Sequence, residues 1–214
     1  MRLMMINLSL LLAVTCTVQP ALANNTAETM KRLVVLGDSL AAGYGLTAEE
    51  AFPVQLERAL KQAGHKVTVI NAGVSGDTTA GGLARLEWTL ADVPDLVLIE
   101  LGGNDALRGL PPEETLANLE AMLQRIRAAG IPVILAGMQA PRNLGEQYTT
   151  EFDQLYPQLA RKYKVSFYPF FLDGVALDPA LNQADGIHPN ASGVVAIVGR
   201  ILPVVESALR SIHK

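Results

Sequence analysis

Short apolar runs alternate with longer amphipathic stretches along the chain. The apolar runs cover residues 33–36, 67–70, 96–101, 133–136 and 165–168. The amphipathic stretches cover residues 49–62, 78–90, 112–129, 148–163 and 189–212. Apolar runs of this length are typical of buried strands, and apolar spacing of three or four residues is typical of helices. Regular alternation of the two predicts an α/β fold in three layers, a parallel sheet with helices on both faces.

Polar side chains follow several of the predicted strands. In a parallel α/β sheet, binding sites form at the carboxyl ends of the strands. The first strand is followed by Gly-Asp-Ser-Leu at positions 37–40, the second by a glycine-rich loop with Gly73, and the third by Gly-Gly-Asn-Asp with Asn104. Asp185 and His188 lie three residues apart near the end of the chain. Each motif alone also fits a helix cap or a turn.

Together, these residues supply the parts of an acyl-transfer site. A serine is a weak nucleophile at neutral pH and needs a neighbouring base. His188 is the candidate base for Ser39, and Asp185 is the candidate residue that orients the imidazole ring and stabilises its protonated form. The backbone N–H groups of Ser39 and Gly73 and the side-chain amide of Asn104 are candidate donors to an oxyanion.

The four motifs, in this order, resemble the sequence blocks of the GDSL or SGNH hydrolases. The second name lists Ser, Gly, Asn and His, which are matched here by Ser39, Gly73, Asn104 and His188. The resemblance runs from about Lys31 to the C-terminal helix and is closest to the bacterial thioesterase I group of periplasmic arylesterases, thioesterases and lysophospholipases.

This resemblance implies both a fold and a chemistry. The fold is a flavodoxin-like single domain with a five-stranded parallel sheet in the order 2-1-3-4-5. The implied substrate is a small-molecule acyl ester or thioester, and the family uses no metal or organic cofactor. The Gly-x-Ser-x-Gly motif of the α/β-hydrolases is absent, which argues against that lineage.

Weaker signals mark candidate substrate-binding residues. The segment after the fourth predicted strand, residues 138–148, contains glycine and proline and lies at the expected site face. We predict that this loop tunes the acyl-chain length of the substrate. The candidate substrate-binding residues are Asp38, Leu107, Leu110, Met138 and Pro141. Each of them is equally compatible with an ordinary place in a loop or in the core.

The N-terminus has the pattern of a secretory signal peptide. A basic start is followed by an apolar stretch at residues 8–14 and by a small-x-small cleavage site, Ala-Leu-Ala, at residues 21–23. The apolar stretch is too short to span a bilayer. We expect a signal peptide at residues 1–23, a linker at 24–30 and one hydrolase domain at 31–214. The domain would be exported to the periplasm, or secreted beyond it, without a stable membrane anchor.

Loss of the signal peptide would remove one arginine and the single cysteine, Cys16. The mature chain would then carry 16 Lys and Arg against 21 Asp and Glu, so its formal net charge would change from −4 to −5. A negative balance argues against nucleic-acid binding, which needs a basic surface. The three histidines lie far apart in the sequence without a cluster of other ligands, so we expect no metal site. Nothing in the sequence indicates an obligate partner, so we expect a monomer.

Two alternatives stay open at this point. One is a carbohydrate esterase of the same fold that removes acetyl groups from a polysaccharide, although an aromatic content of only 5% argues against sugar-stacking platforms. The other is a non-catalytic periplasmic binding protein on the same scaffold, although the complete set of Ser39, Asp185 and His188 argues against it. A comparison of rates on acetylated sugars and on medium-chain esters would distinguish the carbohydrate esterase from the acyl-ester hydrolase. Labelling by a fluorophosphonate probe would distinguish the binding protein from a serine hydrolase.

Overall fold

The central sheet has five parallel strands. The structure, a computed structural model, describes residues 29–91 and 93–212. The strands are β1 (Lys31–Gly37), β2 (Val67–Gly73), β3 (Leu96–Glu100), β4 (Val133–Ala136) and β5 (Ser166–Tyr168). They lie in the order β2-β1-β3-β4-β5, and each neighbouring pair is parallel. The predicted α/β fold and its strand order are confirmed.

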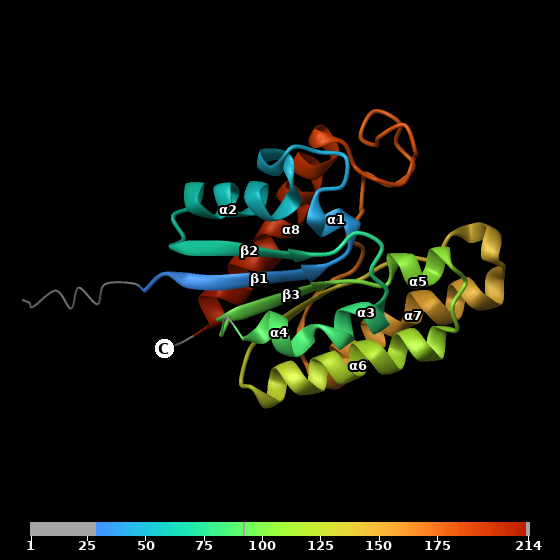
Figure 1. Cartoon of the computed structure of the whole chain (residues 1–214), viewed down its shortest axis with the longest axis horizontal. Coiled ribbons are helices and arrows are strands. Elements are labelled where there is room, and N and C mark those ends of the chain that lie inside the picture. The colour runs from blue at the N-terminus through green and yellow to red at the C-terminus, as the bar shows by residue number, and fades with distance from the viewer. Residues whose placement is uncertain (1–28, 92, 213–214) are drawn as a thin grey trace, which may run out of the picture.

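Helices cover both faces of this sheet (Figure 1). On one face lie α1 (Ser39–Ala42), α2 (Phe52–Gln62) and α8 (Ala191–Ser211). The other face is covered by α3 (Thr79–Ala84), α4 (Leu86–Leu90), α6 (Pro112–Ala128) and α7 (Glu146–Tyr163). The short helix α5 (Gly103–Leu107) follows β3 at the carboxyl ends of the strands, where α1 also begins. This arrangement is the predicted three-layer sandwich.

Several helices begin, end or divide at other residues than the sequence pattern predicts. The stretch predicted as one helix at 78–90 is divided at Arg85, which ends α3 and precedes α4. The helix predicted at 49–62 starts with a 3₁₀ turn, η1 (Ala48–Glu50), and α2 follows with a proline in its first turn. The short elements α1, α5 and a second 3₁₀ turn, η2 (Arg142–Leu144), have too few residues to produce a periodic pattern.

The core lies on both sides of β3, whose five residues are all buried. Burial of one large aliphatic side chain contributes about 1.5–3 kcal/mol relative to exposure. Among the described residues, α8 is the one helix long and apolar enough to span a membrane. Its apolar side chains pack into the core at helical spacing, as Val194, Ile197, Ile201 and Val205 illustrate. Its length and apolarity therefore fit a core helix.

Three predictions fall on the N-terminal region. The signal peptide at 1–23, its cleavage after Ala23 and the loss of Cys16 lie outside the described residues, as does most of the predicted linker at 24–30. These expectations stay predictions. The described chain enters the sheet at Lys31, whose backbone N–H donates to the carbonyl of Lys66 next to β2 (2.9 Å).

Candidate active site

Ser39 is presented by a sharp turn between β1 and α1. Asp38 is the N-cap of α1, and its Oδ1 accepts the N–H of Leu40 (3.0 Å). Ser39 is the first residue of this helix, so its own N–H has no partner within the helix. Its side chain lies at the boundary of core and solvent, with 9% of its surface exposed. The turn thus leaves both the hydroxyl and the N–H of Ser39 available to a ligand.

Two adjacent glycines allow α1 to sit this close to the sheet. Gly37 and Gly73 are paired in the register of β1 and β2. A Cβ atom on Gly37 would lie 2.6 Å from the Cβ of Ala41, and one on Gly73 would lie 2.3 Å from the backbone N of Ala42. Real Cβ atoms do not approach other atoms so closely, so both positions require glycine for close packing.

Asp185 and His188 reach Ser39 from the segment that precedes α8. His188 Nε2 lies 2.9 Å from Ser39 Oγ, and His188 Nδ1 lies 2.7 Å from Asp185 Oδ2. An ionised carboxylate only accepts hydrogen bonds, so Nδ1 carries the proton and Nε2 of the neutral ring accepts from the serine hydroxyl. The structure thus brings together the three residues that the sequence analysis selected.

Hydrogen bonds keep Asp185 ionised although it is partly exposed. The backbone N–H of His188, its imidazole and the backbone N–H of Ile187 together lower the pKa of Asp185 to about 2. Both backbone groups donate to Oδ1, at 3.0 and 2.9 Å, and Oδ2 is left to the ring. The carboxylate therefore stays negative at neutral and at mildly acidic pH.

The ring of His188 is also held by a residue that the sequence analysis did not single out as functional. The Tyr44 ring lies 4.5 Å from the imidazole, centroid to centroid, with 37° between the ring planes. The Gln183 side chain donates to the carbonyl of Tyr44 (2.7 Å) and to that of Pro189 (2.9 Å), which ties the loop after α1 to the loop of His188. Half of the Tyr44 surface remains exposed (54%), and the residue borders the hollow at Ser39.

Asn104 lies next to the same turn but is already hydrogen-bonded. Its Nδ2 donates to Asp38 Oδ2 (3.0 Å) and to the carbonyl of Asp77 (2.9 Å). Asp38 is thus a buried acceptor that orients Asn104 and caps α1. Asp38 is a predicted substrate-binding residue, but the structure leaves the residue only 2% exposed and gives both carboxyl oxygens internal partners.

Two glycines of the loop after β2 differ in how available their N–H groups are. The N–H of Gly73 donates to Asn71 Oδ1 (2.9 Å). Gly76 sits in a turn closed by the bond from the N–H of Asp77 to the carbonyl of Val74 (3.0 Å), with a φ of 84°. The N–H of the third residue in such a turn takes no part in the closing bond. Gly76 is therefore the more accessible donor beside Asn104.

Arg85 lies at the break between α3 and α4 and connects several segments of this edge. Its guanidinium donates to Asp77 Oδ2 (2.6 Å), to the carbonyl of Ala72 (2.7 Å) and to the carbonyl of Gly37 (2.9 Å). One side chain thus joins the ends of β1 and β2 to the loop beside Asn104. The planar fork of arginine suits three simultaneous bonds, which a lysine could not reproduce.

The other predicted substrate-binding residues lie in different environments. Met138, predicted as a groove residue, belongs to the core and is 3% exposed. Leu107 on α5 is half exposed (51%), and Leu110 and Pro141 are partly buried. The Tyr148 hydroxyl donates to the carbonyl of Leu110 (2.8 Å) and connects the two loops that carry these residues. Tyr148 itself belongs to α7, so the predicted loop is shorter than residues 138–148.

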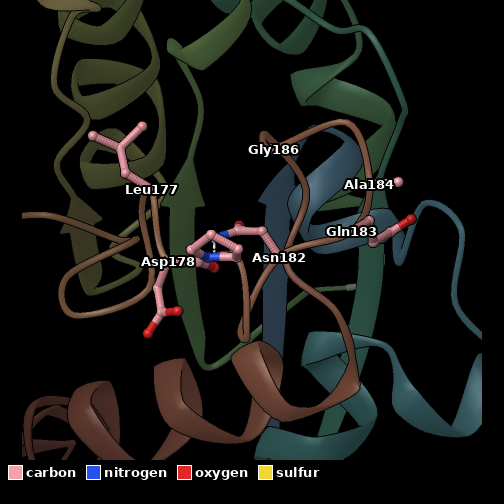
Figure 2. A pocket seen from close by; sticks show the side chains of 7 residues that line it. Leu177, Asp178, Asn182, Gln183, Ala184 and Gly186 are labelled. Carbon is pink, nitrogen blue, oxygen red and sulfur yellow. Dashed lines mark hydrogen bonds between the residues drawn. The ribbon is translucent and has the colours of Figure 1, made fainter.

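The hollow at Ser39 is small. A depression of about 10 Å³ is bordered by Ser39, Tyr44, His188 and their neighbours. A larger cavity of about 470 Å³ lies within the loop before α8, between Leu177 and Gly186, with Asn182 between them (Figure 2). This cavity does not include Ser39, so we assign the chemistry to the shallow site. Among residues 29–91 and 93–212, no group of three or more His, Cys, Asp or Glu side chains could hold a metal ion.

Asp38 makes the stability of the protein depend on pH. Burial raises the pKa of Asp38 from 3.8 to about 6, despite hydrogen bonds from Leu40 and Asn104. A raised pKa in the folded state contributes stability below the unfolded pKa and loses it as the pH rises through 6. Between pH 4 and 7 we expect the free energy of unfolding of the wild type to fall by about 2 kcal/mol relative to Asp38→Asn. Urea unfolding at several pH values measures this, and parallel curves for the two proteins would contradict it.

Several site residues were not identified from the sequence, for reasons that differ from residue to residue. Tyr44 belonged to a recognised motif, but its ring contact with His188 depends on the fold. Gly76 lay in the same glycine-rich loop as Gly73, and only the turn geometry separates them. Arg85 had no signal, because it lay inside a predicted helix. Glu100, a buried residue of β3 whose carboxyl accepts the N–H of Asp38, was detectable as the single charged residue of an otherwise apolar strand.

Comparison with known proteins agrees with this geometry. The model of the GDSL-like lipase/acylhydrolase family matches residues 35–195. The chain is 45% identical to an arylesterase of Vibrio mimicus over 164 residues, which are 76% of this chain and 82% of the relative. It is 44% identical to thioesterase 1/protease 1/lysophospholipase L1 of Escherichia coli K12 over 74% of this chain and 75% of the relative.

A solved structure extends the agreement to the fold. The crystal structure of TesA superposes with a TM-score of 0.80 at 41% identity and covers 83% of this chain and 99% of its own. The resemblance stated from the sequence motifs is therefore confirmed. The chain belongs to the GDSL-like lipase/acylhydrolase family and is an ester hydrolase of the SGNH type.

Proposed function

We propose that this enzyme cleaves acyl esters and thioesters with Ser39 as nucleophile, His188 as general base and Asp185 as the residue that orients the base. The observation that carries this proposal is the continuous chain of hydrogen bonds from Ser39 Oγ through His188 to Asp185, at 2.9 and 2.7 Å. These lengths are within the range that proton transfer from a nucleophile to its base requires.

The reaction has two steps that use the same groups. Ser39 Oγ attacks the acyl carbonyl carbon while His188 Nε2 takes the hydroxyl proton. The tetrahedral intermediate then collapses, the bond to the alcohol or thiol breaks, and His188 returns the proton to the leaving group. Water attacks the acyl-enzyme in the second step, again with His188 as base, and releases the carboxylic acid and Ser39. Asp185 stabilises the imidazolium that forms in each step.

The oxyanion needs donors that point at the reacting carbon. We assign this role to the N–H of Ser39 and to the amide of Asn104, which lies beside Asp38 at the same turn. Both N–H groups of this amide have internal acceptors, so the oxyanion would replace either Asp38 Oδ2 or the carbonyl of Asp77 as one of them. Gly73, the donor predicted from the sequence, has its N–H on Asn71 and its Cα against α1. Gly76 is the better candidate for the third donor, because it lies next to Asp77, to which Asn104 is hydrogen-bonded.

Asn104→Ala is expected to lower kcat by about 10²- to 10³-fold with little change in KM, because the amide stabilises charge that develops in the transition state. Steady-state kinetics with p-nitrophenyl esters measure both constants. Asn118→Ala is a matched control, because this amide bonds Thr79 instead of the turn at Asp38. A kcat for Asn104→Ala equal to that of the control would exclude Asn104 from the oxyanion site.

The shape of the site supports a broad range of small acyl substrates. Several exposed apolar side chains belong to segments that carry the site residues; these are Tyr44, Val74, Leu107 and Ile187. The depression at Ser39 is shallow, so an acyl chain would lie along this apolar surface instead of entering a deep tunnel. The names of the relatives include arylesterase, thioesterase and lysophospholipase. We extend this range of ester and thioester substrates to the present enzyme.

The loop that precedes α7, which contains Pro141, keeps its proposed role in acyl-length preference, and Leu107 and Leu110 keep their proposed role in substrate binding. We also propose that the chain is exported through its N-terminal signal peptide, acts in the periplasm as a monomer, and has no stable membrane anchor. Cell fractionation and light scattering of the mature enzyme test these points directly.

A substrate panel tests the proposed reaction. Rates are compared for p-nitrophenyl esters of increasing chain length, an acyl-CoA, a lysophospholipid and an acetylated polysaccharide. We expect turnover of the esters and the thioester at rates far above that of the polysaccharide. Preferred release of acetate from the polysaccharide would instead support the carbohydrate esterase, and no turnover of any substrate would contradict the proposal.

A further inference from the structure

A carboxyl group is completely buried beneath the nucleophile turn. Glu100 is the last residue of β3, is 0% exposed, and is paired in the sheet with Gly37. A Cβ atom on Gly37 would lie 2.4 Å from Glu100 Oε2. The side chain of Glu100 therefore passes directly under the residue that begins the turn, and the glycine at this position leaves room for it.

The contacts of Glu100 are with backbone N–H groups of this turn. Its Oε2 accepts the N–H of Asp38 (3.2 Å), and the N–H of Ala41 also donates to its carboxyl. The remaining oxygen, Oε1, is buried without a hydrogen-bond partner among the described residues. If the carboxyl were ionised, this oxygen would carry negative charge without a hydrogen bond or a counter-charge. Such a buried charge has a high free-energy cost, and carboxyl groups avoid it by taking up a proton.

The electrostatic surroundings favour the same protonation state. Burial, and next to it the neighbouring acid Asp38, raise the pKa of Glu100 well above its usual value. A negative charge on Asp38 thus disfavours a second negative charge on Glu100. A neutral carboxylic acid keeps a carbonyl oxygen for the two N–H groups and places its proton on the oxygen without a partner.

Glu100 completes the support of a helix that is too short to be stable by itself. The helix α1 has four residues, and helices of this length do not persist in water without outside contacts. Asp38 caps the N–H of Leu40, and Glu100 takes the N–H of Ala41. Between them, these two side chains bind the donors that follow Ser39 and leave the N–H of Ser39 free. A displacement of this turn would move Ser39 Oγ away from His188.

We propose that Glu100, with an uncharged carboxyl, is a positioning residue for the nucleophile. Its carboxyl holds the turn from Asp38 to Ala41 so that Ser39 Oγ stays within hydrogen-bonding distance of His188. This inference rests on the proposed role of Ser39. It adds Glu100, a residue of β3 that contacts neither solvent nor substrate, to the residues on which kcat depends.

Three substitutions separate this role from a contribution to stability alone. Glu100→Gln keeps a neutral carbonyl acceptor and the shape of the side chain, so we expect at least a third of the wild-type kcat. Glu100→Met keeps the length but removes the acceptor, so we expect kcat to fall about 10- to 100-fold with KM changed less than about threefold, as for a misplaced catalytic group. Ile99→Val is the matched control, a destabilising change in the same strand without a polar contact to the turn.

The measurements are steady-state kinetics on a p-nitrophenyl ester, the rate constant of labelling by a fluorophosphonate, and the melting temperature of each variant. We expect Glu100→Met to label more slowly than Ile99→Val even where their melting temperatures agree. Equal kcat and labelling rates for a folded Glu100→Met and the wild type would overturn the inference, as would an equal loss of kcat in Glu100→Gln and Glu100→Met.

Two further outcomes are also decisive. If Glu100→Met does not fold, Glu100→Asp replaces it, because a carboxyl one methylene shorter fails to reach the turn and should lower kcat about tenfold below Glu100→Gln. Equal kcat for these two variants would overturn the inference. A wild type that no fluorophosphonate labels would instead contradict the proposed nucleophile, which distinguishes failure of the proposed function from failure of this inference.

Discussion

Ser39→Ala is expected to lower kcat/KM for acyl esters by about 10⁴-fold or more, the size of effect found when a serine hydrolase loses its nucleophile. The substitution removes the atom that forms the acyl-enzyme and leaves the oxyanion donors in place. The hydroxyl of Ser39 bonds His188, whereas the backbone of the turn is held by Asp38 and its neighbours. The melting temperature should therefore change little. Steady-state assays on p-nitrophenyl butyrate would measure the loss of kcat/KM.

Ser192→Ala provides the control for this experiment, because Ser192 is exposed on α8 and should tolerate the change. Both variants are purified in parallel and tested on the same ester. Residual kcat/KM above about one per cent in Ser39→Ala, after removal of contaminating wild type, would mean that another group attacks the ester.

Asp185→Asn is expected to lower kcat/KM by about 10³- to 10⁴-fold. In the wild type, the carboxylate accepts the proton of His188 Nδ1, so Nε2 is free to act as base. An asparagine can donate to Nδ1 instead and so stabilise the tautomer in which Nε2 carries the proton and cannot accept one from Ser39. The fold should be kept, because Oδ1 can still accept the N–H groups of Ile187 and His188.

The control for this prediction lies in the same loop. Asp178 accepts the N–H of Ala180 and has no contact with the imidazole, so Asp178→Asn should keep nearly full activity. The pKa of Asp185, about 2, places its titration below the assay range, and its own contribution to stability is lost only as the pH falls through that value. A loss of activity on mild acidification therefore has its origin elsewhere. Equal rates for the two asparagine variants would contradict the role of Asp185.

The fold was predictable from the sequence because its signals are repeated. Apolar runs placed all five strands, with ends that differ by a few residues at most; β4 agrees at both ends, whereas β2 extends three residues beyond its predicted end at residue 70. The family motifs added the order of the strands, which periodicity does not contain. The same motifs selected Ser39, Asp185 and His188, which the structure places within hydrogen-bonding distance, because Asp185 and His188 share one turn and Ser39 follows a strand directly.

Other features depend on contacts that no local pattern contains. Met138 follows β4 and looks like a loop residue in the sequence, but the chain turns inward and buries it. Asp38 looks like a polar residue at a site, and only the position of Asn104 in space shows that its second oxygen is used internally. The difference between Gly73 and Gly76 likewise depends on the Asn71 side chain and the turn, not on the glycine itself.

Covalent labelling tests the central claim most directly. The wild type, Ser39→Ala and Ser192→Ala are incubated with a fluorophosphonate, and the site of modification is located by mass spectrometry of the intact chain and of its peptides. The account predicts one phosphonyl group per chain, attached to Ser39, in the wild type and in Ser192→Ala, and none in Ser39→Ala. Unmodified wild type, or equal modification of Ser39→Ala, would contradict it.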